Sequence, residues 1–458
     1  MFPRIATVRL SSLIVLFLSA PILAKPPHVV EMSPPDGATD VDPDTTEFRV
    51  TFDCDMSTGG FSFCGGGPAF PEMQDRPKWT DKRTVVAKVK LEPDHDYHFS
   101  LNCPAAQNFR SADGTPLEPV PWSFSTASAQ AKPDKAEQKK LNQRCLKELM
   151  KLLKDHYSYY DLRVNDWKAL EKKHRSKILA AASTRARVRE VAAMLAEAKD
   201  LHMWLSLKGN STPTHVRKVK LNFDLNGVKT VLPNVKQRSQ SVYTARADDD
   251  IGYILVTTLA DDRKNDLQQV QTALKEFKDC KALILDLRPN AGGSESLALP
   301  IAAWFVTGEK TYSKNVYRDP QSKTGFTEEL SREIKGNDES ARFDRPVAVL
   351  IGPGVMSSAE SFVLMLKQGD RVTLVGAPTY GSSGNPKPFK LENEVEIFIP
   401  SWKDMLPDGT CLEGKGIQPD VKVKAKSADF ETDDPVIERA LKFLRDKASQ
   451  APARKAAR

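Results

Sequence analysis

The sequence predicts a multidomain protein in which an all-β sandwich is followed by a helical segment and then by an α/β core. The first observation is a stretch rich in Pro, Gly and Asp, residues 25–126, that holds short β-like runs between turn signals. The second is the helical spacing of apolar residues within residues 141–199. The third is the alternation of short apolar strands with amphipathic helices after residue 252, which is typical of a largely parallel sheet.

The N-terminal residues 1–24 have the features of a secretory signal peptide. Arg4 and Arg9 precede an apolar run that ends at Ala24, the expected cleavage position. The run is short for a membrane span, and a retained anchor is the alternative interpretation. We therefore expect an exported protein, periplasmic or extracellular, with no stable membrane span. The last residues, 448–458, form a basic tail.

Composition excludes some classes of partner and cofactor. The net charge of +7 is spread along 458 residues, so we expect no nucleic-acid partner. No Cys or His spacing is typical of a metal site, and we expect neither a metal nor another cofactor. Six cysteines in an exported protein permit disulfides, and Cys103 is predicted to pair with Cys54 or Cys64.

Residues 25–126 form the predicted β-sandwich. The segments SPPDGATDV, VTFDCDMS and WSFST within this region resemble the bacterial Ig-like modules. The resemblance implies an Ig-like domain. Because this region shows no catalytic constellation of residues, we expect it to act as a spacer or to dock a protein or cell-envelope partner.

A polar linker, residues 127–139, leads into a helical segment at residues 140–207. The apolar spacing predicts helices at residues 141–157, 167–182 and 184–199. Apolar residues then take every second position from Leu201 to Leu207, which is typical of a strand and places His202 on the opposite face. A lone histidine on a strand is usually structural, so this pattern alone assigns no chemistry to it.

Residues 208–447 form the predicted α/β core. Strands at residues 252–259 and 282–287 flank an amphipathic helix at residues 262–278. A Gly-rich turn then precedes a further helix, at residues 296–306. The polar stretch 308–344 is predicted to be a loop region that borders a cleft.

The segment 345–384 organises the core. A β-branched run at residues 347–351 predicts a buried strand, and an amphipathic helix begins next to Ser357. Ser357 and Glu360 have the spacing of a capping box, which gives the serine a purely structural interpretation. A hydroxyl at this position also faces unpaired backbone N–H groups and the positive end of a helix dipole, which suits the stabilisation of an oxyanion.

Five segments taken together resemble the C-terminal processing, or tail-specific, serine peptidases. They are DLRVNDW at residues 161–167, AKDLHMWL at 198–205, DLRPNAGG at 286–293, SSAESF with VGAPTYG at 357–381, and EGKGIQPD at 413–420. The resemblance implies a crotonase-like α/β peptidase core that acts on a polypeptide substrate.

The resemblance also implies the roles of single residues. Ser357 matches the nucleophile of the family, and Ser382 stands where many members carry a lysine, so the usual Ser–Lys dyad cannot form. His202 and Glu413 match the histidine and glutamate of the branch that includes the tricorn core protease. The family pattern therefore implies a Ser-His-Glu relay and an acyl-enzyme intermediate. Activity should then follow the ionisation of a histidine near pH ~6.5–7.

Two further expectations follow from the same resemblance. Gly292 and Gly293 match one half of the family's oxyanion hole, and the backbone near Ser358 matches the other half. Residues 208–250 are too few for the PDZ domain that most processing peptidases carry. The PDZ-less branch also contains retinoid-binding proteins, so the alternative functions are an inactive protein that binds apolar ligands and an envelope interaction protein.

Overall fold

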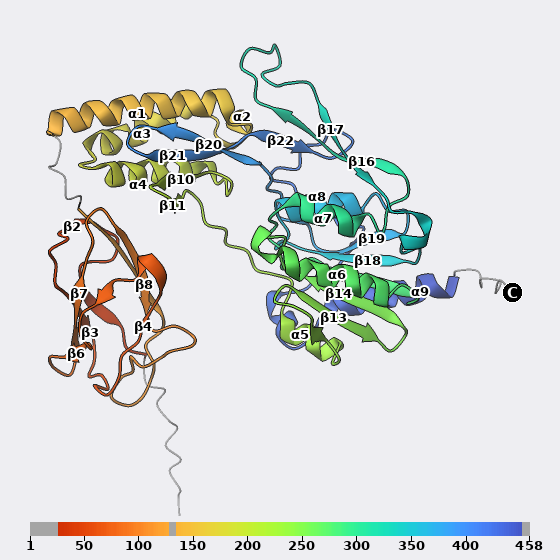
Figure 1. Cartoon of the computed structure of the whole chain (residues 1–458), viewed down its shortest axis with the longest axis horizontal. Helices are drawn as coiled ribbons and strands as arrows, with labels where there is room; N and C mark the ends of the chain where they lie inside the picture. Colours follow the sequence, from red (N-terminus) through yellow and green to blue (C-terminus); the bar gives the residue numbers. More distant parts are fainter. Residues whose placement is uncertain (1–25, 128–133, 451–458) are drawn as a thin grey trace, which may run out of the picture. The chain divides into compact units, whose positions relative to one another are not determined.

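The computed structural model describes residues 26–127 and 134–450. The chain divides into two compact units, Met1–Pro133 and Asp134–Arg458 (Figure 1). The predicted signal peptide, residues 1–24, lies outside the described residues, as do residues 128–133 of the predicted linker and residues 451–458 of the predicted tail. The first three residues of that predicted tail continue the last helix, α9 (Pro435–Gln450).

The first unit packs two sheets around an aromatic core. One sheet has the order β1 (Val29–Ser33), β3 (Glu47–Phe52), β7 (Thr84–Lys90) and β5 (Glu72–Met73), with β6 (Lys78–Trp79) also paired to β7. The other has the order β2 (Ala38–Val41), β9 (Val120–Thr126), β8 (Asp96–Leu101) and β4 (Phe63–Cys64). Alternate residues of β3 are buried, as a strand with one covered face requires.

A disulfide joins Cys64 of β4 to Cys103, which confirms one of the two predicted pairings. Cys54 is a free thiol. The core beneath is aromatic: the ring centroids of Phe48 and Trp122 lie 5.1 Å apart, and the indole N–H of Trp122 donates to the carbonyl oxygen of Pro34 at 3.0 Å. Burying an indole is favourable when its N–H finds such an acceptor.

The second unit begins with helices that cover one face of a small sheet. The helices are α1 (Lys135–His156), α2 (Tyr160–Arg163), α3 (Trp167–Ala180) and α4 (Thr184–Leu195). The sheet has the order β11 (Asn210–Pro213), β10 (Trp204–Leu207), β21 (Val395–Pro400) and β20 (Pro386–Leu391). Leu205 and its partner Ile397 belong to the apolar core that the helices share with this sheet.

Helix α1 starts earlier than predicted, so residues 135–139 of the predicted linker are helical. The reason is an N-cap: the side chain of Asp134 accepts a hydrogen bond from the backbone N–H of Ala136. The strand predicted over residues 201–207 is present over a shorter range, as β10, and His202 lies in the turn before it, so the prediction of a histidine on the strand is wrong. The side chain of Asp200 holds that turn by accepting from the backbone N–H of His202. The antiparallel pairing of β10 with β21 brings residues near position 204 beside residues near position 398.

The predicted α/β core is present as a seven-stranded sheet. Its order is β12 (Lys236–Gln237), β13 (Val242–Ala247), β14 (Ile251–Val256), β15 (Ala282–Asp286), β18 (Val347–Ile351), β19 (Val372–Gly376) and β23 (Val421–Lys422). The strands from β14 to β23 are parallel. One face packs against α6 (Lys264–Glu276), α7 (Glu295–Ala302) and α8 (Ser358–Leu366), and the other against α5 (Leu225–Val231) and α9.

The prediction of a loop over residues 308–344 is wrong for most of that stretch. A third sheet contains β17 (Leu330–Lys335), β16 (Glu309–Tyr317) and β22 (Trp402–Met405), in that order. The residues of β16 are polar in composition, yet Ser313 and Asn315 are buried, and the hydroxyl of Ser313 donates to the carboxylate of Asp404 at 2.6 Å. Polar composition therefore does not exclude a strand where buried partners satisfy its side chains.

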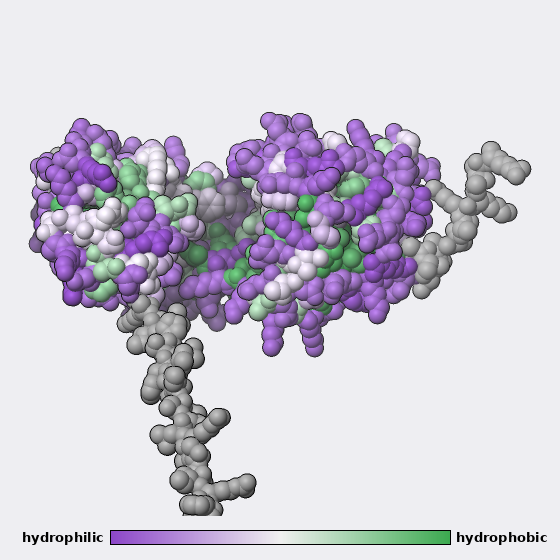
Figure 2. All heavy atoms as spheres, turned by 90° about the horizontal axis from the view of Figure 1, so that it is seen from below, coloured by the Kyte–Doolittle hydropathy of each residue, from purple (hydrophilic) through white to green (hydrophobic). Residues whose placement is uncertain are grey.

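Figure 2 shows a mostly hydrophilic surface with exposed apolar residues in limited areas. Within the described ranges, no helix combines the length and the apolar character needed to cross a membrane.

Candidate active site

Ser357 sits between the parallel strand β18 and helix α8, in a strained backbone conformation. Its φ is 57° and its ψ is −134°. A positive φ is uncommon for residues other than glycine, and strain of this kind concentrates at functional sites. The backbone N–H of Ser357 is held by the carbonyl oxygen of Ser382 at 2.8 Å and by the carboxylate of Glu360 at 3.2 Å. Its hydroxyl is thus presented at the positive end of α8.

His202 meets the hydroxyl of Ser357. Its Nε2 lies 3.0 Å from Oγ of Ser357, and the imidazole is buried with 8% of the residue exposed. The backbone N–H of His202 donates to Oδ1 of Asp200 at 2.9 Å, which fixes the turn before β10. The structure therefore brings together two predicted site residues that are 155 positions apart in sequence.

Burial lowers the pKa of His202 below its ordinary value of 6.5. The neutral ring is therefore favoured at neutral pH, which is the form that can accept a proton from a serine.

Ser382 contacts the other ring nitrogen of His202. Its Oγ lies 3.1 Å from Nδ1, and the side chain is fully buried. If Nε2 is to accept the proton of Ser357, Nδ1 must carry the ring proton, and Ser382 then accepts a hydrogen bond from it. The sequence gives one signal for this role: Ser382 occupies the position at which the resembled family often has lysine.

Glu360 ties the nucleophile to the loop that carries Ser382. The carboxylate is fully buried and accepts from the backbone N–H groups of Gly381 at 2.8 Å and Ser382 at 2.9 Å, and from the hydroxyl of Thr379. Burial raises the pKa of Glu360 to about 7, while these hydrogen bonds act in the opposite direction. The predicted capping box between Ser357 and Glu360 is present, and Oγ of Ser357 also lies within hydrogen-bond distance of Nε2 of His202.

Glu413 is hydrogen-bonded to the loop next to His202. Its carboxylate pairs with Arg163 and accepts from the backbone N–H of Ser383 at 3.0 Å. Within the part of the chain that the structure describes, no hydrogen bond joins Glu413 to His202. Burial, and then the charge of Asp200, raise the pKa of Glu413. By hydrogen bonding, Glu413 is connected to the loop behind His202 at Ser383, the neighbour of the Ser382 that contacts Nδ1.

The Gly-rich turn after β15 lies against the nucleophile. A Cβ atom on Gly292 would lie 3.0 Å from Cβ of Ser357 and 2.8 Å from the carbonyl oxygen of Met356, so only glycine fits there. The N–H of Gly292 already donates to Oδ1 of Asn290 at 2.9 Å. The N–H of Gly292 is therefore already paired, which leaves the N–H of Gly293 as the candidate oxyanion donor of this turn.

The backbone N–H groups of Gly293 and Ser358 have no acceptor among the residues that the structure describes. The hydroxyl of Ser358 donates to the carbonyl oxygen of Gly293 at 2.7 Å, which holds these two residues together. Two unpaired N–H groups beside a serine hydroxyl form the kind of arrangement that stabilises an oxyanion. Over the described ranges, no group of three His, Cys, Asp or Glu side chains could hold a metal ion.

The titration of His202 gives the first testable prediction. Because burial disfavours the charged ring, the imidazole should titrate with a midpoint below 6.5, so the base stays neutral as the pH falls to that value and is lost below it. This would move the acid limit of activity below the range expected from the sequence. Histidine-selective NMR measures it, with the His202 resonances identified by their loss in His202→Ala. A midpoint at or above 6.5 would contradict the prediction.

The fold and the Ser357–His202 pair define a site of the serine hydrolase class, and comparisons with known proteins point to the same class. Residues 250–423 match the model of Peptidase family S41. The chain is 27% identical over 212 residues to the carboxy-terminal processing protease CtpA of Bacillus subtilis, an alignment that covers 45% of this chain and 43% of that protein. It is 27% identical over 178 residues to a CtpA-like serine protease of Staphylococcus haemolyticus, with 38% and 34% covered.

The chain thus spans less than half the length of these curated relatives. The matches support a serine peptidase of the C-terminal processing type and do not favour an inactive ligand-binding protein.

Solved structures agree on the fold. A crystal structure from Parabacteroides merdae, named for a peptidase, has a TM-score of 0.59 and 24% identity, and covers 69% of this chain and 99% of that chain. Mature CPAF in complex with lactacystin has a TM-score of 0.54 and 12% identity, with 69% and 100% covered. At these identities the likeness concerns the fold alone.

Proposed function

We propose that this protein is an exported serine endopeptidase of the C-terminal processing type that cleaves polypeptides through an acyl-enzyme intermediate. The observation that carries the proposal is the 3.0 Å contact between Oγ of Ser357 and Nε2 of His202, made by a serine with a φ of 57°. A nucleophile in reach of a neutral base, on a strained turn at a helix start, is the arrangement that serine hydrolases share.

The proposed reaction uses residues of this chain only. His202 Nε2 accepts the proton as Oγ of Ser357 attacks the carbonyl carbon of a peptide bond, and the N–H groups of Gly293 and Ser358 receive the negative charge on its oxygen. His202 then gives the proton to the leaving amine, and water, activated by the same ring, hydrolyses the ester.

Ser382 holds the ring of His202 in the tautomer that this reaction needs, because its hydroxyl accepts from Nδ1. Glu413 supports the base indirectly, by holding the backbone N–H of Ser383 at 3.0 Å. The relay inferred from the family resemblance thus becomes a chain in which the loop of residues 382–383 stands between histidine and glutamate.

Two parts of the proposal concern the remainder of the chain. The signal-like residues 1–24 suggest export to the periplasm or beyond. The two-sheet first unit, which we propose to be Ig-like, is suited to docking a protein or cell-envelope partner, because no cluster of candidate catalytic residues was found in its sequence.

A fluorophosphonate probe tests the reaction without knowledge of the natural substrate. We expect it to label the full chain on Ser357, as located by mass spectrometry of the labelled peptide, and to block cleavage of an unfolded polypeptide such as reduced casein. Labelling confined to another residue would reject the mechanism. No labelling and no cleavage, together with tight binding of apolar ligands, would favour the binding-protein alternative.

A further inference from the structure

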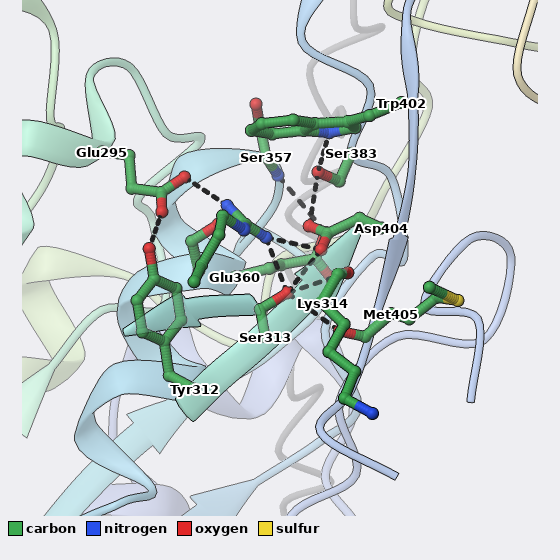
Figure 3. Close-up of polar contacts among 12 residues, drawn as sticks. Glu295, Tyr312, Ser313, Lys314, Ser357, Glu360, Ser383, Trp402, Asp404 and Met405 are labelled. Carbon is green, nitrogen blue, oxygen red and sulfur yellow. Dashed lines mark hydrogen bonds and ion pairs between the residues drawn. The ribbon is translucent and has the colours of Figure 1, made fainter. Parts of the chain in front are cut away.

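A buried guanidinium lies at the junction of the third sheet and the candidate active site. Arg332 of β17 has a side chain that is 13% exposed and lies between two aromatic rings, 5.3 Å from the centroid of Tyr312 and 4.6 Å from that of Trp402. It forms ion pairs with Glu295 at 2.6 Å and with Asp404. Figure 3 shows Glu295 beside Tyr312, and Asp404 beside Ser383 and Ser313, in the same cluster of polar contacts as Ser357.

The ion pair of Arg332 with Glu295 links the guanidinium to the segment that carries Gly293, a candidate oxyanion donor. Glu295 is the first residue of α7 and follows Gly293 by two positions. Besides Arg332, its carboxylate accepts a hydrogen bond from the hydroxyl of Tyr312. Since one residue separates Glu295 from Gly293 in the chain, we expect a shift of Glu295 to disturb the backbone around Gly293.

The ion pair of Arg332 with Asp404 links the guanidinium to the loop that contacts His202. Asp404 of β22 is fully buried and accepts from the hydroxyl of Ser383 at 2.8 Å. The carbonyl oxygen of Ser383 in turn accepts from the hydroxyl of Tyr159 at 2.7 Å. Ser383 is the immediate neighbour of Ser382, which contacts Nδ1 of His202. Asp404 therefore fixes the loop that orients the imidazole.

We propose that Arg332 is a positioning residue for catalysis. It holds residues 293–295, which carry the candidate oxyanion donor Gly293, at a fixed separation from the loop of residues 382–383, which contacts His202. The proposal rests on the function proposed above. Arg332 carries one positive charge between two carboxylates, and one of these, Asp404, is fully buried. Removing the guanidinium would leave buried negative charge without a partner, which is costly, so both segments would rearrange.

The guanidinium of Arg332 makes two further contacts, and one of its partners also bonds Asp404. Arg332 also donates to the hydroxyl of Ser313 at 2.7 Å and to that of Ser361 in α8 at 3.4 Å. Ser313 donates in turn to Asp404 at 2.6 Å. The planar guanidinium serves several acceptors at once, which a lysine ammonium cannot reproduce in the same geometry.

The test measures the rate at which a fluorophosphonate labels Ser357 in the full chain. This rate is divided by the fraction of folded protein, which circular dichroism gives. Arg332→Met should lower kinact by about 10- to 100-fold, because misplacing a site by about 1 Å has effects of that size, while KI for the small probe changes little. Arg332→Lys should recover part of the loss. Arg318→Met is the matched control: Arg318 is 12% exposed, pairs with Asp161 and lies over the rings of Tyr160 and Phe326. Among the described residues, its hydrogen bonds go to Lys154 and Asp161 and none goes to residues 382–383 or to α7.

A second variant keeps the proposal testable if Arg332→Met does not fold. Ser383→Ala removes a single hydroxyl and frees the loop from Asp404, and should lower kinact by about 10-fold. Its control is Ser401→Ala: among the described residues, the half-buried hydroxyl of Ser401 has the backbone carbonyl oxygen of Asn385 as its hydrogen-bond partner.

The outcomes separate the two proposals. Wild-type labelling together with unchanged kinact in Ser383→Ala and in folded Arg332→Met would overturn the positioning role. An equal loss in Arg318→Met would assign Arg332 to general stability and overturn it as well. A wild-type chain that is not labelled at Ser357 would instead overturn the proposed function on which this inference rests.

Discussion

Ser357→Ala is expected to lower peptide cleavage by about 10⁴- to 10⁶-fold and to abolish labelling by fluorophosphonate. The reason is that the substitution removes the oxygen that lies 3.0 Å from Nε2 of His202 on the strained turn before α8. The oxyanion donors remain in this variant, so a small residual rate above water is expected.

Cleavage of reduced casein, followed by gel electrophoresis and mass spectrometry, measures this loss. Ser331→Ala is a suitable control because Ser331 lies exposed on β17, and this variant should cleave like wild type. Thermal melting of Ser357→Ala should confirm that the chain is folded. Persistent labelling in folded Ser357→Ala would show that another nucleophile acts.

His202→Ala should lower cleavage by about 10²- to 10⁴-fold, the contribution usual for a general base. Ser357 would keep its position in this variant, because its backbone is held by Ser382 and Glu360, but its hydroxyl would lose its proton acceptor. The combined Ser357→Ala, His202→Ala variant should be little worse than Ser357→Ala alone, since the two residues act as a unit.

The matched control for the histidine is His174→Ala. His174 lies on α3 and contacts Glu197 at 2.8 Å, in the helical part of the unit. It should leave the labelling rate of Ser357 unchanged. Full activity in His202→Ala would reject the assignment of the base.

Local patterns predicted the parts of the site that depend on neighbouring residues. The apolar run of β18, the spacing of α8 and the serine between them follow from periodicity and capping. Alternation over residues 201–207 placed His202 opposite the apolar face, and the structure buries Met203 and Leu205 in the helical core as this requires.

Contacts between distant segments were beyond the reach of such patterns. The resemblance named Glu413 as the support of the base, but the contact of His202 with Ser382 depends on how the loop after β19 folds, which spacing cannot encode. The same limit explains the error over residues 308–344. Arg332 is of a residue type that is usually solvated, and its burial depends on carboxylates from distant segments: Glu295, and Asp404, which lies 72 positions later.

The pairing of β10 with β21 has a consequence for the order of events during folding. Trp204 lies opposite Phe398, so the strand that follows His202 has no ladder partner on that side until β21 is present. Contacts of such large sequence separation form late and carry a high entropic cost of loop closure. A chain that ends before residue 395 would lack this pairing, so we expect the contact between His202 and Ser357 to form only after β21 has joined the sheet.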